Sequence, residues 1–357
     1  MRSVLLFVIC LLGSIGVARA DPLAVSLNVD TARAVLAAVR DPNLTEARAL
    51  AIAKMPGSAG LIRKIKSYGR QADEAMLAQA LLAAAQHRVS DVDKNFRFAA
   101  ARDAAPAIGA VLDQLTDPSR HVLDDVKQRI ALFTPPSLSG TITGYLIVGG
   151  TSGGFAFGDP EFYLDLAHFP SAPLASTILE HELFHAVQAL AAHVAGPVVA
   201  GPCRNAIPGA ARLDKLFDSL VEEGTASYVG DVLALSETGD AEIVKARAQF
   251  QHGQNILRRS VTLLELSVHA VTTGASISDD DIYSAGFYDD EILYSLGYVV
   301  TRAIAREQGP GAVAELLGKP GALFVQRYVA LKSYGTPGVP KLFDDTVRWG
   351  NALGACR

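Results

Sequence analysis

Two histidines and two glutamates stand inside an otherwise apolar stretch near the middle of the chain, which reads Leu179-Glu180-His181-Glu182-Leu183-Phe184-His185-Ala186. Residues four apart lie on the same face of an α-helix, so His181 and His185 can direct their imidazoles at one point. Burying such side chains without a partner would cost free energy. A shared cation removes that cost, so the pattern predicts a metal-binding helix.

The spacing His-Glu-x-x-His is typical of zinc hydrolases. Glu182 follows the first histidine and can reach a water molecule at the metal without ligating the metal. We therefore predict Zn²⁺ as the cofactor, His181 and His185 as two of its ligands, and Glu182 as the general base.

A catalytic zinc usually has three protein ligands and one open position. The helix predicted over Leu213–Leu235 has an apolar face and contains Glu222-Glu223-Gly224-Thr225-Ala226. Its small residues favour close approach to another helix. Neighbouring carboxylates on a helix point about 100° apart, and this geometry alone does not choose between Glu222 and Glu223 as the third ligand.

His-Glu-x-x-His followed by Glu-Gly-x-Ala resembles the gluzincin metallopeptidases, which include the thermolysin and membrane alanyl aminopeptidase families. In the aminopeptidases the glutamate before the glycine ligates zinc, which implies that Glu223 is the third ligand. The interval from His185 to Glu223 is longer than is usual there and looks more like a little-studied family of zinc-dependent peptidases in the same clan. The Gly-x-Met-Glu-Asn signature of the aminopeptidases is absent, which counts against an exopeptidase.

The resemblance extends to Tyr294-Ser295-Leu296-Gly297. In the aminopeptidases a Tyr-x-x-Gly follows the zinc motifs, and its hydroxyl stabilises the oxyanion of the tetrahedral intermediate. This implies that Tyr294 is a second catalytic residue, since a phenol donates a hydrogen bond without adding charge. Tyr283 and Tyr288 are the alternatives.

Three further polar residues lie near these motifs. Gln188 is three positions after His185, on the metal side of the helix, and either supports that histidine or is simply polar at the cleft. Ser227 stands where thermolysin-like enzymes carry an aspartate that supports a histidine ligand. His193 lies about 120° around the helix from His181, and we predict that it is on the surface.

The fold class predicted is α+β, predominantly helical. Residues 21–135 have helical patterns, including Ala75–Ala85 and Ala107–Leu115, and Pro135-Pro136 ends this region. Residues 136–357 would form the gluzincin-like peptidase domain, beginning with three short strands. These strands, over residues 141–148, 154–157 and 162–166, are expected to form a small antiparallel sheet of hairpins before the active-site helix. Either of the last two could be the edge to which a peptide adds.

The first twenty residues have the pattern of a secretory signal peptide. A basic start precedes an apolar run over Val4–Val17, and Ala18-Arg19-Ala20 fits cleavage after Ala20. Cleavage removes two arginines and no acid, so the formal net charge changes from −5 to −7. We therefore expect a secreted or periplasmic protein with no membrane attachment after cleavage. The acidity also argues against nucleic acid as a partner.

Three other features are interpreted more simply. Arg63-Lys64 with Lys66 is the densest basic run, and its simplest interpretation is a solvated helix face. The acidic residues Asp279-Asp280-Asp281 fall in a predicted loop over 272–290, which we interpret as a solvated loop in preference to a calcium site. Cys203 and Cys356 remain after cleavage, and in an oxidising compartment they favour one disulfide over two separate thiols.

The resulting hypothesis is a zinc metallopeptidase, a hydrolase that acts on a peptide or protein substrate. One alternative is a non-catalytic, zinc-stabilised periplasmic binding protein, in which a fourth ligand such as Glu222 closes the site. The other is a metal-free helical binding protein in which the motif is coincidental. Substrate preference and oligomeric state are not given by the sequence.

Overall fold

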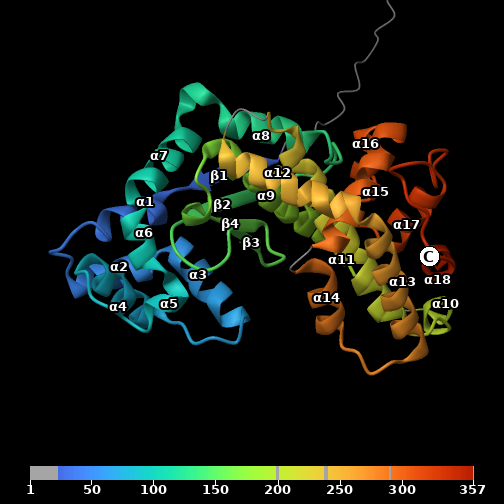
Figure 1. The fold of residues 1–357 in the computed structure, drawn as a ribbon, viewed down its shortest axis with the longest axis horizontal. Helices are drawn as coiled ribbons and strands as arrows, with labels where there is room; N and C mark the ends of the chain where they lie inside the picture. Colours follow the sequence, from blue (N-terminus) through green and yellow to red (C-terminus); the bar gives the residue numbers. More distant parts are fainter. Residues whose placement is uncertain (1–22, 198–200, 237–239, 289–290, 357) are drawn as a thin grey trace, which may run out of the picture.

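The computed structural model describes residues 23–197, 201–236, 240–288 and 291–356. The predicted signal peptide and its cleavage site therefore lie outside the described residues. A four-stranded sheet and the long helix α9 (Ala172–Ala195) occupy the middle of the molecule (Figure 1). The helices between residues 30 and 116 lie at one end of the long axis, and the helices after residue 256 lie at the other. The protein is mostly helical, and the α+β class is confirmed.

The N-terminal part contains one strand and eight helices within the described residues. These are β1 (Ala24–Asn28), α1 (Asp30–Ala38), α2 (Glu46–Ala53), α3 (Pro56–Ser67), α4 (Glu74–Ala85), α5 (Asp93–Phe96), α6 (Phe98–Asp103), α7 (Ala105–Thr116) and α8 (Val122–Ala131). The predicted helices over 75–85 and 107–115 correspond to α4 and α7. Strand β1 was not predicted, because its five residues alternate only weakly between apolar and polar and the segments that follow have helical patterns.

The remaining helices follow the sheet and carry most of the candidate site. They are α9, α10 (Pro202–Asn205), α11 (Ala210–Val229), α12 (Ala241–Asn255), α13 (Leu257–Thr273), α14 (Asp279–Phe287), α15 (Ile292–Gln308), α16 (Pro310–Ala314), α17 (Ala322–Val329) and α18 (Asp344–Ala355). Short 3₁₀ turns lie at Pro118–Arg120, Leu166–His168 and Val232–Ala234. Among the described residues, no helix combines the length and apolarity needed to cross a membrane.

The sheet has the order β1-β2-β4-β3 and is not the antiparallel sheet that we predicted. Strand β2 (Thr141–Ile147) pairs in parallel with both β1 and β4 (Glu161–Asp165), and only β3 (Gly154–Ala156) runs antiparallel, against β4. The hairpin expected between the second and third predicted strands is therefore present, whereas the one between the first and second is absent. Because β4 has partners on both sides, the sheet edge on this side is β3.

Aromatic side chains explain why β4 lies between β2 and β3. Tyr163 is paired in register with Tyr145 on β2 and with Phe155 on β3. Its ring stacks on both neighbours, with centroids 5.1 and 5.0 Å apart. Such cross-strand pairs stabilise a sheet. Exchanging the positions of β3 and β4 would break this stack.

Helices cover both faces of the sheet. Gly60 of α3 lies against the ring of Tyr163, where a Cβ atom would come within 2.0 Å of the ring. On the opposite face, Gly154 of β3 lies against Glu182 of α9.

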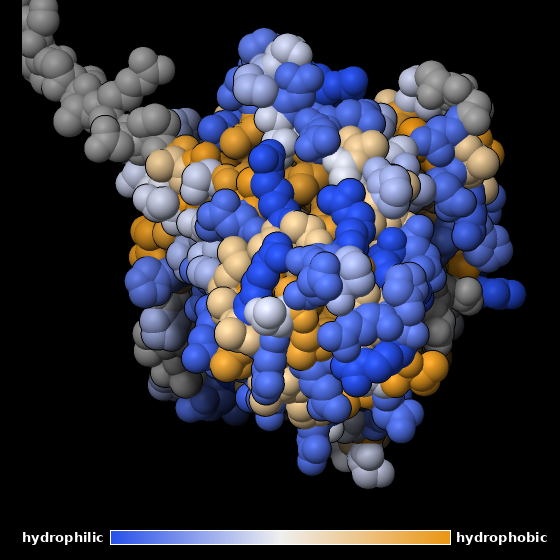
Figure 2. Space-filling view, turned by 90° about the vertical axis from the view of Figure 1, so that its left-hand side faces the viewer, coloured by the Kyte–Doolittle hydropathy of each residue, from blue (hydrophilic) through white to orange (hydrophobic). Residues whose placement is uncertain are grey.

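The buried apolar side chains form one cluster that extends from Ala32 to Leu353. On the surface of the N-terminal end, hydrophilic residues predominate and hydrophobic ones show in the hollows between them (Figure 2). The division at residue 135 stays a prediction.

The acidic triplet at 279–281 is not a loop, contrary to our expectation. It forms the first turn of α14, where Ser278 is the N-cap: its hydroxyl accepts a hydrogen bond from the Asp281 amide at 3.0 Å. The Asp281 carboxylate accepts one in return from the Ser278 amide. Acidic side chains at a helix N-terminus interact favourably with the helix dipole. The triplet therefore has a structural explanation.

The predicted disulfide is present. Cys203 on α10 and Cys356 at the end of α18 are bonded, with their Cα atoms 5.5 Å apart. The bond joins the C-terminal tail to the segment between α9 and α11, 153 residues earlier in the chain.

A tight helix crossing brings Gly224 of α11 against Gly297 of α15. A Cβ atom on Gly297 would lie 2.5 Å from the Leu220 carbonyl oxygen and 2.7 Å from the Gly224 Cα atom. The two backbones therefore touch, as the small residues near Glu223 predicted. This contact sets the separation between the helix that carries Glu223 and the one that carries Tyr294.

We predict that Gly297→Ala destabilises the protein although alanine is the better helix former. The added methyl group must separate α11 from α15, at a cost of about 2–3 kcal/mol. Gly109→Ala is the matched control, because Gly109 is also inside a helix but has no atoms within 4 Å of its virtual Cβ among those described. The control should increase the free energy of unfolding by about 1 kcal/mol, because alanine has the higher helix propensity. Its thermal unfolding midpoint should therefore rise slightly. A stabilising effect at both positions would contradict the tight crossing.

Candidate metal centre

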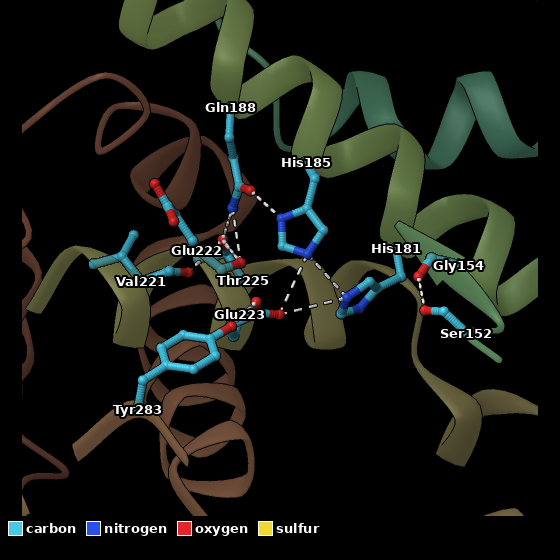
Figure 3. Close-up of polar contacts among 10 residues, drawn as sticks. All are labelled: Ser152, Gly154, His181, His185, Gln188, Val221, Glu222, Glu223, Thr225 and Tyr283. Atoms are coloured by element: carbon cyan, nitrogen blue, oxygen red, sulfur yellow. Dashed lines mark hydrogen bonds and ion pairs between the residues drawn. The ribbon is translucent and has the colours of Figure 1, made fainter. Parts of the chain in front are cut away.

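Three predicted ligands converge between α9 and α11 (Figure 3). The Nε2 atoms of His181 and His185 are 3.0 Å apart. The Glu223 Oε2 atom lies 3.6 Å from the first nitrogen and 3.3 Å from the second. These three residues form a group whose ligand atoms all lie within 4.8 Å of one another. The one-turn spacing in α9 brings the two histidines together, and the close approach of Gly230, at the end of α11, to the α9 backbone near His181 brings Glu223 to them.

Glu223, and not Glu222, belongs to this group. The Glu222 side chain is exposed and its carboxylate points away from the imidazoles in Figure 3. Burial alone would raise the pKa of Glu223, but the neighbouring His185 and His181 imidazoles hold that pKa well below its usual range. Glu223 is therefore a carboxylate at neutral pH, as a metal ligand must be.

The pKa of His185 is governed by the same contact. Burial opposes the charged imidazole, but the Glu223 carboxylate beside it outweighs burial and raises the pKa of His185 to about 10. The pair therefore retains a proton at neutral pH when no metal is bound. A metal must displace this proton, so metal binding should weaken as the pH falls.

A chain of hydrogen bonds orients His185. The Val221 carbonyl accepts from the Thr225 hydroxyl at 2.7 Å, which in turn accepts from the Gln188 amide nitrogen at 2.7 Å. That nitrogen also donates to the Glu222 carbonyl at 2.9 Å. A carbonyl oxygen can only accept, so the amide oxygen of Gln188 must face His185 Nδ1, 2.7 Å away.

The direction of this chain shows that the residues fit a metal. Nδ1 of His185 carries a proton, so once the second ring proton is displaced the Nε2 lone pair is directed at the centre of the group. The Glu223 Oε2 atom is buried and forms no hydrogen bond within the described part of the chain. Convergent imidazole nitrogens and a carboxylate oxygen form a donor set typical of Zn²⁺.

Glu182 lies beside the group and is 6% exposed. Its Oε2 atom is buried and has no hydrogen-bond partner among the described residues. A Cβ atom on Gly154 would lie 2.4 Å from its Oε1 atom, so the glycine leaves room for this carboxyl group beneath the edge strand. Burial raises the pKa of Glu182, which is the shift that a general base near neutral pH requires.

Two tyrosines from different helices face Glu223. Tyr283 of α14 donates its hydroxyl to Glu223 Oε1 at 3.3 Å. Tyr294 of α15 is partly buried and lines the cleft, and its ring lies against that of His181, with centroids 6.3 Å apart. Burial raises the pKa of both phenols, so both are protonated donors. Tyr288 also lines the cleft but is 55% exposed. Tyr294 and the alternative Tyr283 therefore both lie near Glu223, and the oxyanion role of Tyr294 stays a prediction.

The group opens into a cleft of about 600 Å³. One wall is the outer edge of β3, which contributes Gly154, Phe155 and Ala156. Lys64 and Tyr68, at the end of α3, also line the cleft.

The sequence singled out some of these polar neighbours and missed others. Gln188 was identified from its i+3 spacing, whereas Thr225 was missed because it is distant along the chain and was seen only as a departure from a family motif. Ser227, which replaces the supporting aspartate of thermolysin-like enzymes, is buried. His193 is exposed as predicted, at the rim of the cleft.

Comparison with known proteins identifies the family. Residues 51–332 match the family model described as "Putative zinc dependent peptidase (DUF5700)". The match covers more than half of the chain, which therefore belongs to this family. No curated protein matches the chain, and no solved structure does.

We predict that the hydrogen-bond chain sets the metal affinity of the group. Gln188→Leu removes the acceptor that orients His185 and should weaken zinc binding about 10- to 100-fold. Thr225→Val keeps the shape but removes a hydroxyl, and should have a smaller effect in the same direction. Thr225→Ser retains the hydroxyl and is the matched control. Competition with a zinc chelator measures the zinc affinity of the unaltered protein and of the three variants. Equal affinities would contradict the role of this chain of hydrogen bonds.

Proposed function

We propose that this protein is a gluzincin-type zinc metallopeptidase that acts in a secreted or periplasmic compartment. The observation that carries the proposal is the convergence of His181, His185 and Glu223 at a cleft that also contains Glu182. The family of zinc-dependent peptidases supports the same reaction class. The signal-like N-terminus supports the compartment, as does a disulfide, which persists in oxidising surroundings.

In this proposal His181, His185 and Glu223 hold Zn²⁺. The metal, when bound, supplies Lewis acidity that polarises a carbonyl group and acidifies a coordinated water. Glu182 takes a proton from the attacking water and later gives it to the leaving amine. Its buried position and raised pKa favour both halves of that transfer. Tyr294, with Tyr283 as the second candidate, donates a hydrogen bond to the developing oxyanion.

Strand β3 offers a way to position a peptide. It is the last strand in the order β1-β2-β4-β3, and its residues line the cleft. An extended peptide can add to such an edge through main-chain hydrogen bonds. The Glu182 carboxyl group lies against Gly154 of this strand, so a peptide bound here passes next to the proposed general base.

The zinc-stabilised binding protein is the less favoured function. It needs a fourth protein ligand to close the coordination sphere, and Glu222 was the candidate. Its side chain is exposed and turned away from the other three ligands. An open position facing a cleft is what a hydrolytic zinc requires.

Metal content is the first measurement. We expect about one zinc per mature chain, and loss of that zinc in His181→Ala, because two remaining ligands bind the ion weakly. His193→Ala is the matched control, since His193 is on the same helix but is not part of the group. Absence of zinc from the unaltered protein after remetallation would reject the hydrolase and favour the metal-free binding protein.

The role of Glu182 is tested separately. Glu182→Gln should retain zinc and lose about 10²- to 10⁴-fold in the rate of peptide hydrolysis, because the amide cannot accept the proton. Glu180→Gln is the control: Glu180 lines a different cavity, with Arg129 and Asp231, and should leave the rate nearly unchanged. Full turnover by the Glu182 variant would exclude this residue as the base.

A further inference from the structure

The densest basic run of the chain is not only a solvated helix face. It lies in the last turns of α3, and one of its members, Lys64, lines the catalytic cleft. The Lys64 ammonium lies 5.1 Å from the centroid of the Tyr68 ring and 5.3 Å from that of Phe155 on the edge strand β3. Lys66 is exposed on the same helix and does not line the cleft.

The packing of α3 on the sheet places Lys64 there. Gly60 has no side chain, which lets the helix backbone rest on the Tyr163 ring in the middle of the aromatic stack. Lys64 is four residues later and therefore lies one turn further along the same face. That turn carries it outward from β4 to Phe155 on β3, the strand that borders the cleft.

Lys64 has no carboxylate partner within the described residues. Its neighbour Arg63 instead forms an ion pair with Asp159 at 2.8 Å. The other formally charged side chains that line the cleft, apart from the histidines, are the glutamates 182, 222 and 223. Lysines in the last turn of a helix also stabilise the helix dipole, but this does not require the ammonium to lie between two rings at a cleft.

We infer that Lys64 binds a carboxylate of the substrate, and that this peptidase prefers peptides with a negative charge close to the scissile bond. The inference rests on the proposed function and extends it to the substrate class. The two rings hold the cation in place by cation–π attraction, and a peptide lying along β3 brings its own carboxylate to it. The carboxylate belongs either to an Asp or Glu side chain or to the C-terminus of the peptide.

Lys64 has one competing role. Its charge is near enough to Glu182 to lower the pKa of that carboxyl group slightly, as the weakest of several influences. If this were its whole purpose, removing the charge would change the hydrolysis of acidic and neutral peptides by the same factor. A substrate-binding role instead predicts an effect on acidic peptides alone.

The test uses the full mature zinc-loaded protein and quenched fluorescent peptides in matched pairs. One arm compares Glu with Gln at each position in turn, and the other compares a free with an amidated C-terminus. For one of these charges, kcat/KM should be about tenfold higher than for its neutral partner. The ratio should fall to about one in Lys64→Gln and persist in Lys66→Gln. Direct binding of the same peptides to Glu182→Gln, measured by fluorescence anisotropy, should show the same ratios.

The outcomes separate this inference from the proposed function. Cleavage without any preference, or a preference that survives in Lys64→Gln, overturns the carboxylate site and leaves the peptidase intact. An equal loss of kcat/KM for charged and neutral peptides in Lys64→Gln means that the lysine acts only on the pKa of Glu182. That result also overturns the carboxylate site. Lys64-dependent binding of charged peptides without cleavage overturns the peptidase and supports the site. The arm that shows the preference identifies which carboxylate is bound.

Discussion

The contact between two glycine backbones, Gly224 on α11 and Gly297 on α15, determines the rest of the candidate site. Each glycine belongs to a motif that carries chemistry: one follows Glu223, and the other lies three residues after Tyr294. A helix pair held apart by ordinary side chains would separate the carboxylate from the phenol. Gly230, at the end of α11, lies in the same way against the backbone of α9 near His181. Small residues thus set the distances between the three helices that build the metal centre.

The convergence of the two histidines beside Glu182 could be predicted because these residues are close together in the sequence. His181, Glu182 and His185 lie within two turns of one helix, so the 3.6-residue period is enough to place them together. Glu223 required a resemblance to known families, because helix geometry alone did not distinguish it from Glu222. Tyr283 could not be anticipated as a partner of Glu223, since its segment was assigned to a loop and its hydrogen bond spans 60 residues.

The sheet shows where local patterns are insufficient. Each of the three strands after residue 140 was located to within two residues, but their pairing was wrong. A short interval between strands favours a hairpin, and this rule holds for β3 and β4. It fails for β2 and β3, because the stack of Tyr145, Tyr163 and Phe155 requires β4 between them. Side-chain packing across strands overrides the preference for pairing between sequential strands. As a result β3 is the edge strand that borders the cleft.

The bond between Cys203 and Cys356 closes the C-terminal part of the chain into a covalent ring. Glu223, Tyr283 and Tyr294 belong to this ring, whereas the helix with His181 and His185 lies just outside it. One cut of the backbone anywhere inside the ring therefore releases no fragment, and both halves of the metal centre stay on one connected molecule. After a single cut inside the ring, Glu223 and the two histidines would meet again through an intramolecular association and not through an encounter of two separate chains.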